Sequence, residues 1–303
     1  MDNKNRDIII GCLAAIGCEV FFGLSYAFTK QATGITTPMA LLGWRFVVAF
    51  AVINLLRLCG IVKINLKGKS IKQILTVALL NPVIYFIGEV YGIKFTTSSE
   101  VGVFYACFPV FTIIASTLIL NKKPEKRQIA GIAVTITGVI ITVFAVGMTA
   151  SMSLKGYAFM VLGLTSYSLY SVFVEKAEDY TDIEITYLML AAGASVYGSV
   201  AAAEAYIAGN ISQLVSLPFA STAFLTAILY QGIGCSILAF FLANVSIAKI
   251  GVNRMASFIG ISTVVSIITG IFVLGEPFSK MQIAGAIVIL AGVYIANTRL
   301  NIQ

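Results

Sequence analysis

Long apolar runs separated by short polar connectors make up almost the whole sequence. The runs are continuously apolar, which favours helices over the alternating pattern of membrane-barrel strands. A helix needs roughly 20 mostly apolar residues to cross the hydrocarbon layer of a membrane, and charged or Gly-, Pro-, Asn- and Ser-rich breaks divide the chain into ten such runs. We therefore predict ten transmembrane helices near residues 8–29, 38–57, 73–93, 98–120, 127–148, 156–174, 185–207, 221–247, 252–274 and 281–298.

The composition supports this assignment. Of the 303 residues, 59% are hydrophobic and 11% are charged, whereas a soluble domain usually carries about 25% charged residues. Ten spans leave only short connectors, so almost nothing remains for a soluble domain. The sequence predicts an all-α integral membrane protein that passes repeatedly through the cell membrane and has membrane lipids as its surroundings.

The basic residues are distributed unevenly over the connectors. If the N-terminus is cytoplasmic, fifteen Lys and Arg residues fall on the cytoplasmic side, four fall outside, and Arg45 lies within a span. Cytoplasmic connectors of membrane proteins carry an excess of Lys and Arg. Both termini are therefore predicted to be cytoplasmic, as an even number of spans requires.

A repeat is visible within the chain. The sequence QIAG occurs at residues 128–131 and again at 282–285, an offset of 154. When this offset is held without gaps over residues 110–141, 13 of 32 positions are identical, including the pair Gly138 and Gly292. Repeats at a fixed offset are the signature of a duplicated architecture.

The repeat unit contains five spans, and this odd number makes the second copy enter the membrane in the opposite sense. The connectors before the two QIAG sequences agree with this inversion, because the first has four basic residues between 122 and 127 and the second has only Lys280. Equivalent connectors on opposite sides of a membrane should differ in this way. We predict two inverted five-helix repeats, residues 1–149 and 150–303.

Several classes of chemistry receive no support from the sequence. There is no histidine, which is the commonest metal ligand, and the five cysteines show no paired spacing. The sequence has no GxxxxGK[ST] loop, which would bind the phosphates of ATP. The net charge of +7 is spread over short connectors, which does not favour nucleic-acid binding. We expect no metal, no cofactor and no nucleic-acid partner, and proton chemistry would fall to carboxylates.

Several motifs together resemble a known family. Residues 96–145 contain Pro109 within a helix, a short charged connector and then QIAG, and this stretch resembles the helix pair that ends each half of the EamA family in the drug/metabolite transporter superfamily. Residues 274–276 match the family's Leu-Gly-Glu element before the final helix, whereas Asn-Lys-Lys at 121–123 replaces it in the first half. The Arg-Phe pair at 45–46 also resembles a pair often found in the family's second span.

The resemblance covers nearly the whole chain and implies a secondary transporter, not an enzyme, with a central cavity and alternating access. It also implies that the fifth and tenth helices are mainly scaffold. Family members carry amino acids, sugars, nucleosides, polyamines or drugs. Our first hypothesis is export of amino acids or related small molecules, with proton coupling as an addition; a drug, nucleoside or sugar transporter of the same fold is the alternative. A monomer and a homodimer are both open.

Ionisable residues inside a membrane are costly and usually face the bundle interior or water. Within the predicted spans these residues are Glu19, Arg45, Glu89 and Glu204. Glu19 shares a helical face with Phe22 and Tyr26 and is our first candidate for a substrate-binding or coupling carboxylate. The alternative is a packing glutamate paired with Arg45, and Arg45 itself either binds substrate or organises helices. Glu204 lies near the outer end of a span and is expected to reach headgroups or water.

Asn81, Tyr85 and Glu89 recur every four residues on the third span, which stacks an amide, a phenol and a carboxylate on one face. This pattern predicts the lining of a substrate cavity; the alternative is that Glu89 reaches the outer interface beside Lys94 while Tyr85 packs. Pro82 kinks the same span, and such kinks mark binding sites, hinges or simple bends. Further candidates for the cavity wall, each of which could instead hold helices together, are Tyr105, Ser166, Tyr170, Gln231 and Ser257.

Two other classes compete with a carrier. An intramembrane enzyme would need catalytic groups clustered near one interface, and no paired-Asp, Ser-Lys or His arrangement is present. A channel would need rings of charge or a filter-like loop. The duplication instead indicates two halves that move against each other, so a carrier is the preferred interpretation.

Overall fold

The computed structural model describes residues 3–95, 105, 107–146, 153–274 and 280–297, and every regular element among them is a helix. The first repeat contains α1 (Asn3–Thr33), α2 (Pro38–Leu58), α3 (Ile71–Ala78), η1 (Leu79–Ile84), α4 (Tyr85–Phe95), α6 (Phe108–Leu120) and α7 (Lys126–Val146). The second repeat contains α8 (Leu154–Glu175), α9 (Asp182–Ile207), α10 (Ile211–Ala220), α11 (Thr222–Leu229), η2 (Tyr230–Ala239), α12 (Phe240–Ile250), α13 (Val252–Ala256), η3 (Ser257–Ile259), α14 (Gly260–Leu274) and α15 (Lys280–Asn297).

Each predicted span corresponds to a helix or to a run of consecutive helical segments, and within the described residues six are long and apolar enough to cross a membrane. The part of the fourth span before Tyr105, and most of the Leu-Gly-Glu element at 274–276, lie outside the described residues. One element was not predicted. The structure has α10 in what the sequence analysis treats as a connector, because its ten residues are too short to cross a membrane.

Large apolar side chains are exposed on the outside of the helices. Leu118, Phe144, Phe219 and Tyr294 are all more than half exposed. Water-soluble proteins rarely present so much apolar surface, whereas a lipid environment favours it. The described surface is therefore that of an all-α integral membrane protein, as predicted.

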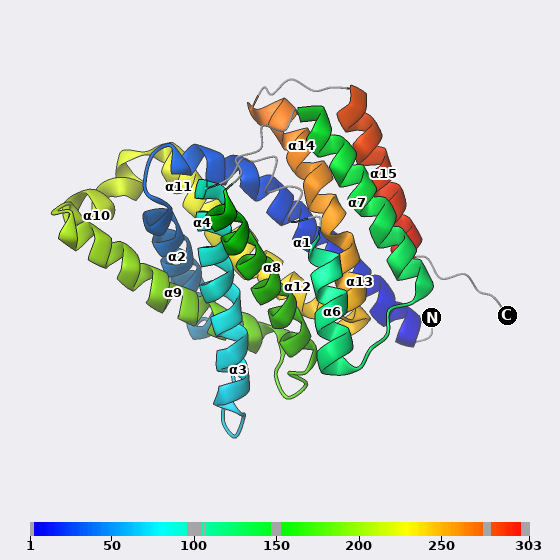
Figure 1. Ribbon diagram of the computed structural model, residues 1–303. Helices are drawn as coiled ribbons and strands as arrows, with labels where there is room; N and C mark the ends of the chain where they lie inside the picture. Colours follow the sequence, from blue (N-terminus) through cyan, green and yellow to red (C-terminus); the bar gives the residue numbers. More distant parts are fainter. Residues whose placement is uncertain (1–2, 96–104, 106, 147–152, 275–279, 298–303) are drawn as a thin grey trace.

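Helices α7 and α15 lie side by side at one edge of the molecule, next to α14 (Figure 1). A Cβ atom added to Gly138 would lie 2.8 Å from the carbonyl oxygen of Gly285, and one added to Gly292 would lie 2.7 Å from that of Gly131. The 154-residue offset relates Gly131 to Gly285 and Gly138 to Gly292, so the two contacts are reciprocal. Glycine is needed at these positions because a neighbouring backbone cannot move aside as a side chain can.

The third and eighth spans are interrupted at equivalent places. In the first repeat the wide helical turns of η1 follow α3, and Asn81 departs from helical geometry with φ −140° and ψ 119°. In the second repeat η2 separates α11 from α12. The repeat offset maps η1 onto residues 233–238, which lie inside η2. Interrupted helices at equivalent positions of two repeats often border transporter binding sites.

Side chains of the second repeat bind the backbone carbonyl groups at η1. The hydroxyl of Ser166 on α8 donates a hydrogen bond to the carbonyl oxygen of Leu80 at 2.7 Å. The hydroxyl of Tyr197 on α9 donates to the carbonyl oxygen of Val83, also at 2.7 Å. Each unpaired carbonyl would cost several kcal/mol away from water. The interruption of the first repeat is thus held by the second.

Gly292→Ala is expected to separate α7 from α15. The new Cβ atom would lie 2.5 Å from the backbone nitrogen of Thr135 and 2.7 Å from the carbonyl oxygen of Gly131, and such overpacking costs about 1 to 3 kcal/mol of unfolding free energy. The control is Gly17→Ala, whose Cβ atom would meet only the Cδ1 atom of Leu242, at 3.1 Å. Both changes alter helix propensity alike. Thermal denaturation in detergent, followed by circular dichroism, should show the lower midpoint for Gly292→Ala; equal midpoints would contradict the packing.

Candidate functional site

A carboxylate and two phenols meet beside α4. The hydroxyl groups of Tyr85 and Tyr105 each donate a hydrogen bond to Oε1 of Glu89 at 3.1 Å, and the two hydroxyl oxygens lie 3.3 Å apart. Within the part of the chain that the structure describes, no donor is recorded for the other oxygen of Glu89. Glu89 is thus hydrogen-bonded to two phenols inside the protein.

Glycines bring this cluster against the second repeat. A Cβ atom added to Gly88 would lie 2.5 Å from the backbone nitrogen of Gly163 on α8, so α4 and α8 are in backbone contact. The ring of Tyr85 consequently lies 5.0 Å from the ring of Tyr167, also on α8. The face of the third span that was predicted from its four-residue spacing thus contacts α8 of the second repeat through Tyr85.

Arg45 on α2 is only 5% exposed. Its Nε atom donates to the hydroxyl of Ser236 in η2 at 2.7 Å, and its guanidinium lies 4.7 Å from the ring centroid of Phe86. Nη2 has no hydrogen-bond partner among the described residues. Glu89 is close enough to interact electrostatically with Arg45, but the recorded ion pairs do not include these two residues. Arg45 and Glu89 are therefore near each other, and no ion pair between them is recorded among the described residues.

Asn81 provides an unpaired amide at the helix interruption. Its side chain is fully buried, and neither amide atom has a hydrogen-bond partner among the described residues. Tyr170 is a neighbour, but its hydroxyl donates to Oδ1 of Asn244 at 2.6 Å, and Asn244 in turn donates to Thr186 at 3.0 Å. An unsatisfied buried polar group costs about 1 to 3 kcal/mol, which a bound ligand can recover.

Glu19 lies on the α1 side of these groups. It is 1% exposed, its Oε2 atom has no hydrogen-bond partner in the described part of the chain, and Ser262 on α14 faces it. The ion pair with Arg45 that the sequence left open is not among the recorded ion pairs. Tyr167 lies within electrostatic reach of Glu19 and packs on Tyr85, and so connects the two carboxylate regions.

Three further candidates, Gln231, Ser257 and Ser166, have no recorded hydrogen bond to the cluster formed by Arg45, Tyr85, Glu89 and Tyr105. Gln231 in η2 donates to the hydroxyl of Thr29 at 3.0 Å and so joins η2 to α1. The hydroxyl of Ser257, at the start of η3, donates to the carbonyl oxygen of Arg254 in the preceding α13 at 2.6 Å. Ser166 binds the backbone of η1, as described above. The side chain of Tyr26 lies outside the described residues.

Four residues at the site were not predicted. Ser236 and Asn244 are polar residues within the eighth span and lie eight residues apart, which places them near one helical face. Tyr167 precedes Tyr170 by three residues on α8, and this spacing is also a helical neighbour pair. These three signals were present in the sequence. Tyr197 is a lone aromatic residue in a run of small residues, and only its contact with η1 distinguishes it.

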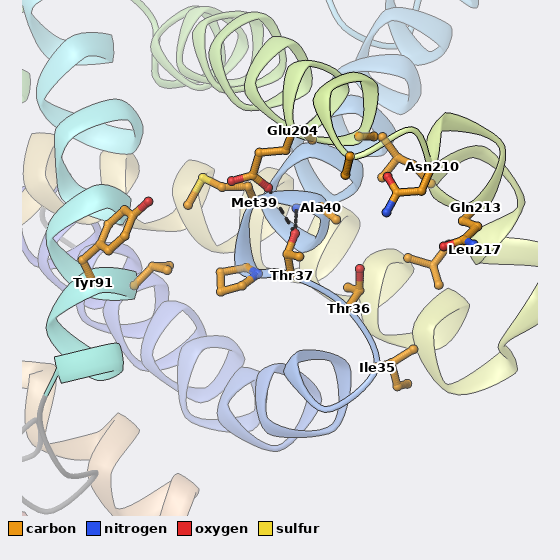
Figure 2. A pocket seen from close by; sticks show the side chains of 16 residues that line it. Ile35, Thr36, Thr37, Met39, Ala40, Tyr91, Glu204, Asn210, Gln213 and Leu217 are labelled. Carbon is orange, nitrogen blue, oxygen red and sulfur yellow. Dashed lines mark hydrogen bonds between the residues drawn. The ribbon is translucent and has the colours of Figure 1, made fainter.

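A pocket of about 480 Å³ opens where α1 leads into α2, at the end of the molecule predicted to face outside. Both repeats line it: Thr37 comes from the first and Glu204 and Gln213 come from the second (Figure 2). Val90 of its wall directly follows Glu89 on α4. Part of the pocket wall is therefore formed by the helix that carries Glu89.

Three ion pairs lie at the opposite, predicted cytoplasmic end. Each joins a residue of the first repeat to one of the second, with nitrogen-to-oxygen distances of 2.5 to 2.6 Å. In two of them the carboxylate lies next to the connector between α8 and α9. The pairs are Lys69 with Glu184, Lys122 with Glu175, and Lys249 with Asp7.

Comparison with known proteins identifies the family. The EamA-like transporter family matches residues 9–144 and again residues 154–298. The chain belongs to this family. The two matches confirm the duplication inferred from the QIAG sequences, and EamA-like proteins are transporters and not enzymes. Among the described residues, no group of three or more His, Cys, Asp or Glu side chains is arranged to hold a metal.

Relatives of this EamA-like transporter span almost its full length. An uncharacterized transporter of Bacillus subtilis (strain 168), YcxC, is 32% identical over 291 residues, which cover 95% of this chain and 93% of YcxC. A protein of Salmonella typhimurium (strain LT2) named a probable amino-acid metabolite efflux pump is 23% identical, with 91% of each chain covered. A solved crystal structure has the same fold, with a TM-score of 0.75 and 16% identity over 96% of this chain and 98% of that one.

Proposed function

We propose that this EamA-like transporter exports amino acids or closely related metabolites by alternating access. One observation carries the choice of substrate: Arg45 has an unpaired guanidinium nitrogen, and no ion pair between Arg45 and the nearby Glu89 is recorded among the described residues. An amino acid has the complementary pair of charges. Its carboxylate would bind Arg45, and its ammonium group would bind Glu89 beside the hydroxyl of Tyr85.

The surroundings of Arg45 support a charged substrate over a neutral one. Removing a guanidinium from water is costly unless an anion accompanies it, and a sugar or a nucleoside brings no anion. Aromatic rings adjoin the proposed site, with Phe46 centred 5.5 Å from Phe86 and 5.6 Å from Tyr197. Such a wall suits the apolar side chain of an amino acid. The Salmonella relative that is named an amino-acid metabolite efflux pump gives independent support.

The two ends of the molecule support a carrier mechanism. The outer pocket opens at one end, beside the helix that carries Glu89, and three ion pairs among the described residues join the repeats at the other end. With the orientation predicted from Lys and Arg, this arrangement corresponds to an outward-facing state. Rocking of one repeat against the other would break the inner ion pairs and close the outer pocket.

Reconstitution tests the proposal directly. A thermal-shift screen of the purified protein against amino acids, nucleosides, sugars and drugs would select a ligand, because a ligand that binds the native state raises its stability. Counterflow of that compound in proteoliposomes should then saturate. Saturable counterflow of a sugar or a nucleoside, without any for amino acids, would overturn the substrate assignment, and non-saturating flux would indicate a channel.

Glu89→Gln should weaken amino-acid transport while keeping the shape of the site. The change removes a charged hydrogen bond to the ammonium group, worth about 1.5 to 3 kcal/mol, so half-saturation should rise by about 10- to 150-fold. The matched control is Glu125→Gln, since Glu125 is exposed in the connector before α7. Counterflow at varied substrate concentration measures both. A half-saturation like that of the Glu125→Gln protein would rule out Glu89 as the ammonium-binding group.

Glu19→Gln tests proton coupling separately from substrate binding. Glu19 is buried with an unpaired oxygen, and it lies apart from the Arg45 and Glu89 pair. If Glu19 carries the proton, substrate accumulation by the Glu19→Gln protein under a pH gradient should fall to the level measured without a gradient. Substrate counterflow should keep its wild-type rate. Gradient-driven accumulation that survives the substitution would exclude Glu19 as the coupling group.

Glu175→Gln should favour the inward-facing state, because Glu175 pairs with Lys122 across the repeats. Partly exposed ion pairs contribute up to about 1 kcal/mol, so the population should shift by up to about fivefold.

The labelling rate of Thr36→Cys, in the outer pocket, measures this shift. A membrane-impermeant maleimide labels the cysteine in a background without the five native cysteines. Labelling should be slower in the Glu175→Gln and Lys122→Met proteins than in the wild type. The double variant should be labelled no more slowly than either single variant, because both changes break the same ion pair. Unchanged labelling, as expected for the exposed control Glu178→Gln, would contradict the gate.

A further inference from the structure

The outer pocket has recognition chemistry of its own. We propose that it is a second binding site, selective for solutes that carry a primary ammonium group. Glu204 is the single charged side chain among its described lining residues. Binding to this pocket can be measured without transport, so it can be tested separately from the proposed transport function.

The carboxylate of Glu204 is held in place at the pocket wall. Its Oε2 atom accepts a hydrogen bond from the hydroxyl of Thr37 at 3.3 Å. That hydroxyl also accepts a hydrogen bond from the backbone N–H of Ala40 at 3.2 Å, as the N-cap of α2. The cap fixes the direction in which Thr37 donates, and Figure 2 shows both contacts. For the other oxygen of Glu204 no donor is recorded among the described residues, so it can accept from a ligand.

Two further side chains with amide oxygens lie elsewhere on the pocket wall. Asn210 and Gln213 also line the pocket from the α9–α10 side (Figure 2), and their side-chain amides have no recorded hydrogen bond in the described part of the chain. An ammonium group has three N–H donors, a charge and no acceptor, so the carboxylate of Glu204 is its strongest partner in the pocket. A carboxylate ligand would be repelled by Glu204, and an alcohol would bring a single donor and no charge.

The rest of the pocket suits an apolar body. Met39, Leu214 and Leu217 contribute to its lining. Its volume of about 480 Å³ lies within the usual range for small-molecule sites. The expected ligand is therefore a primary amine with a short hydrocarbon part, and the ammonium end of an exported amino acid would meet the same chemistry on its way out.

Trp44 provides a direct readout. It is the only tryptophan in the sequence. Its indole N–H donates to the carbonyl oxygen of Leu214 at 3.0 Å, and Leu214 lines the pocket. A ligand that enters the pocket should therefore change the fluorescence of Trp44 without any added label.

The test is a titration of purified wild-type protein, in detergent without amine lipids, with 3-methylbutylammonium and with the neutral 3-methylbutanol. The amine should change Trp44 fluorescence saturably, and the alcohol should not. Glu204→Gln should raise the dissociation constant at least about tenfold, since it removes a charge-assisted hydrogen bond. Gln213→Leu should raise it by a smaller factor, and the matched Glu125→Gln protein should bind as wild type. Equal binding by wild type and Glu204→Gln, or equal responses to amine and alcohol, would overturn the site.

Glu89→Gln separates this site from the buried cluster. If the outer pocket is the site, the Glu89→Gln protein should bind the amine with the wild-type dissociation constant even where its transport is lost. Loss of amine binding in Glu89→Gln, with Glu204→Gln unaffected, would place the amine in the cluster and reject the second site. Circular dichroism melting of each variant shows that the fold is retained, which is expected because Glu204 is exposed.

Lipid headgroups can present the same ammonium chemistry. Repeating the titration in nanodiscs of phosphatidylglycerol, with and without phosphatidylethanolamine, identifies the source. Weaker apparent binding of the amine with phosphatidylethanolamine would show that a lipid amine occupies the site, whereas equal binding would show selectivity for soluble amines. No binding in either membrane would overturn the proposal.

Discussion

A polar group inside this protein has to find its partner within the protein, because lipid offers none. The interruption at η1 shows this constraint most clearly, since Ser166 and Tyr197 of the second repeat bind its carbonyl groups. The same constraint makes the exceptions informative. The unpaired Nη2 of Arg45 and the unpaired amide of Asn81 are buried where such atoms are costly. A polar ligand that enters between the repeats could supply the missing partners.

The duplication explains why these groups lie where they do. Each repeat contributes an interrupted helix, and the candidate site receives Asn81 from η1 and Ser236 from η2. Neither repeat supplies the site alone, because Arg45 of the first repeat donates to Ser236 of the second. Relative motion of the repeats must therefore change the site. The glycine contacts between α7 and α15 lie at the edge of the molecule and fit a scaffold role.

Most of the fold could be predicted from the sequence because it follows from periodicity and charge. Hydropathy located the spans, and the 154-residue offset related the repeats. Spacing along one helix also predicted that Tyr85 and Glu89 share a face, and their side chains are hydrogen-bonded there. Spacing cannot reveal which helices are neighbours. The sequence therefore did not predict that Arg45 donates to Ser236 of η2, or that Gln231 donates to Thr29 of α1. The ion pair of Arg45 with Glu19 that the sequence left open is not recorded.

The ion pairs that join the repeats are a reversible kind of contact. A carrier must leave each of its states, so the free-energy difference between them has to stay within a few kcal/mol. Partly exposed pairs such as Lys122 with Glu175 contribute little individually and exchange readily with water. A continuous apolar interface at the same place would stabilise one state far more strongly. Weak charged contacts at one end and an open pocket at the other are therefore compatible with repeated switching, which the proposed transport cycle requires.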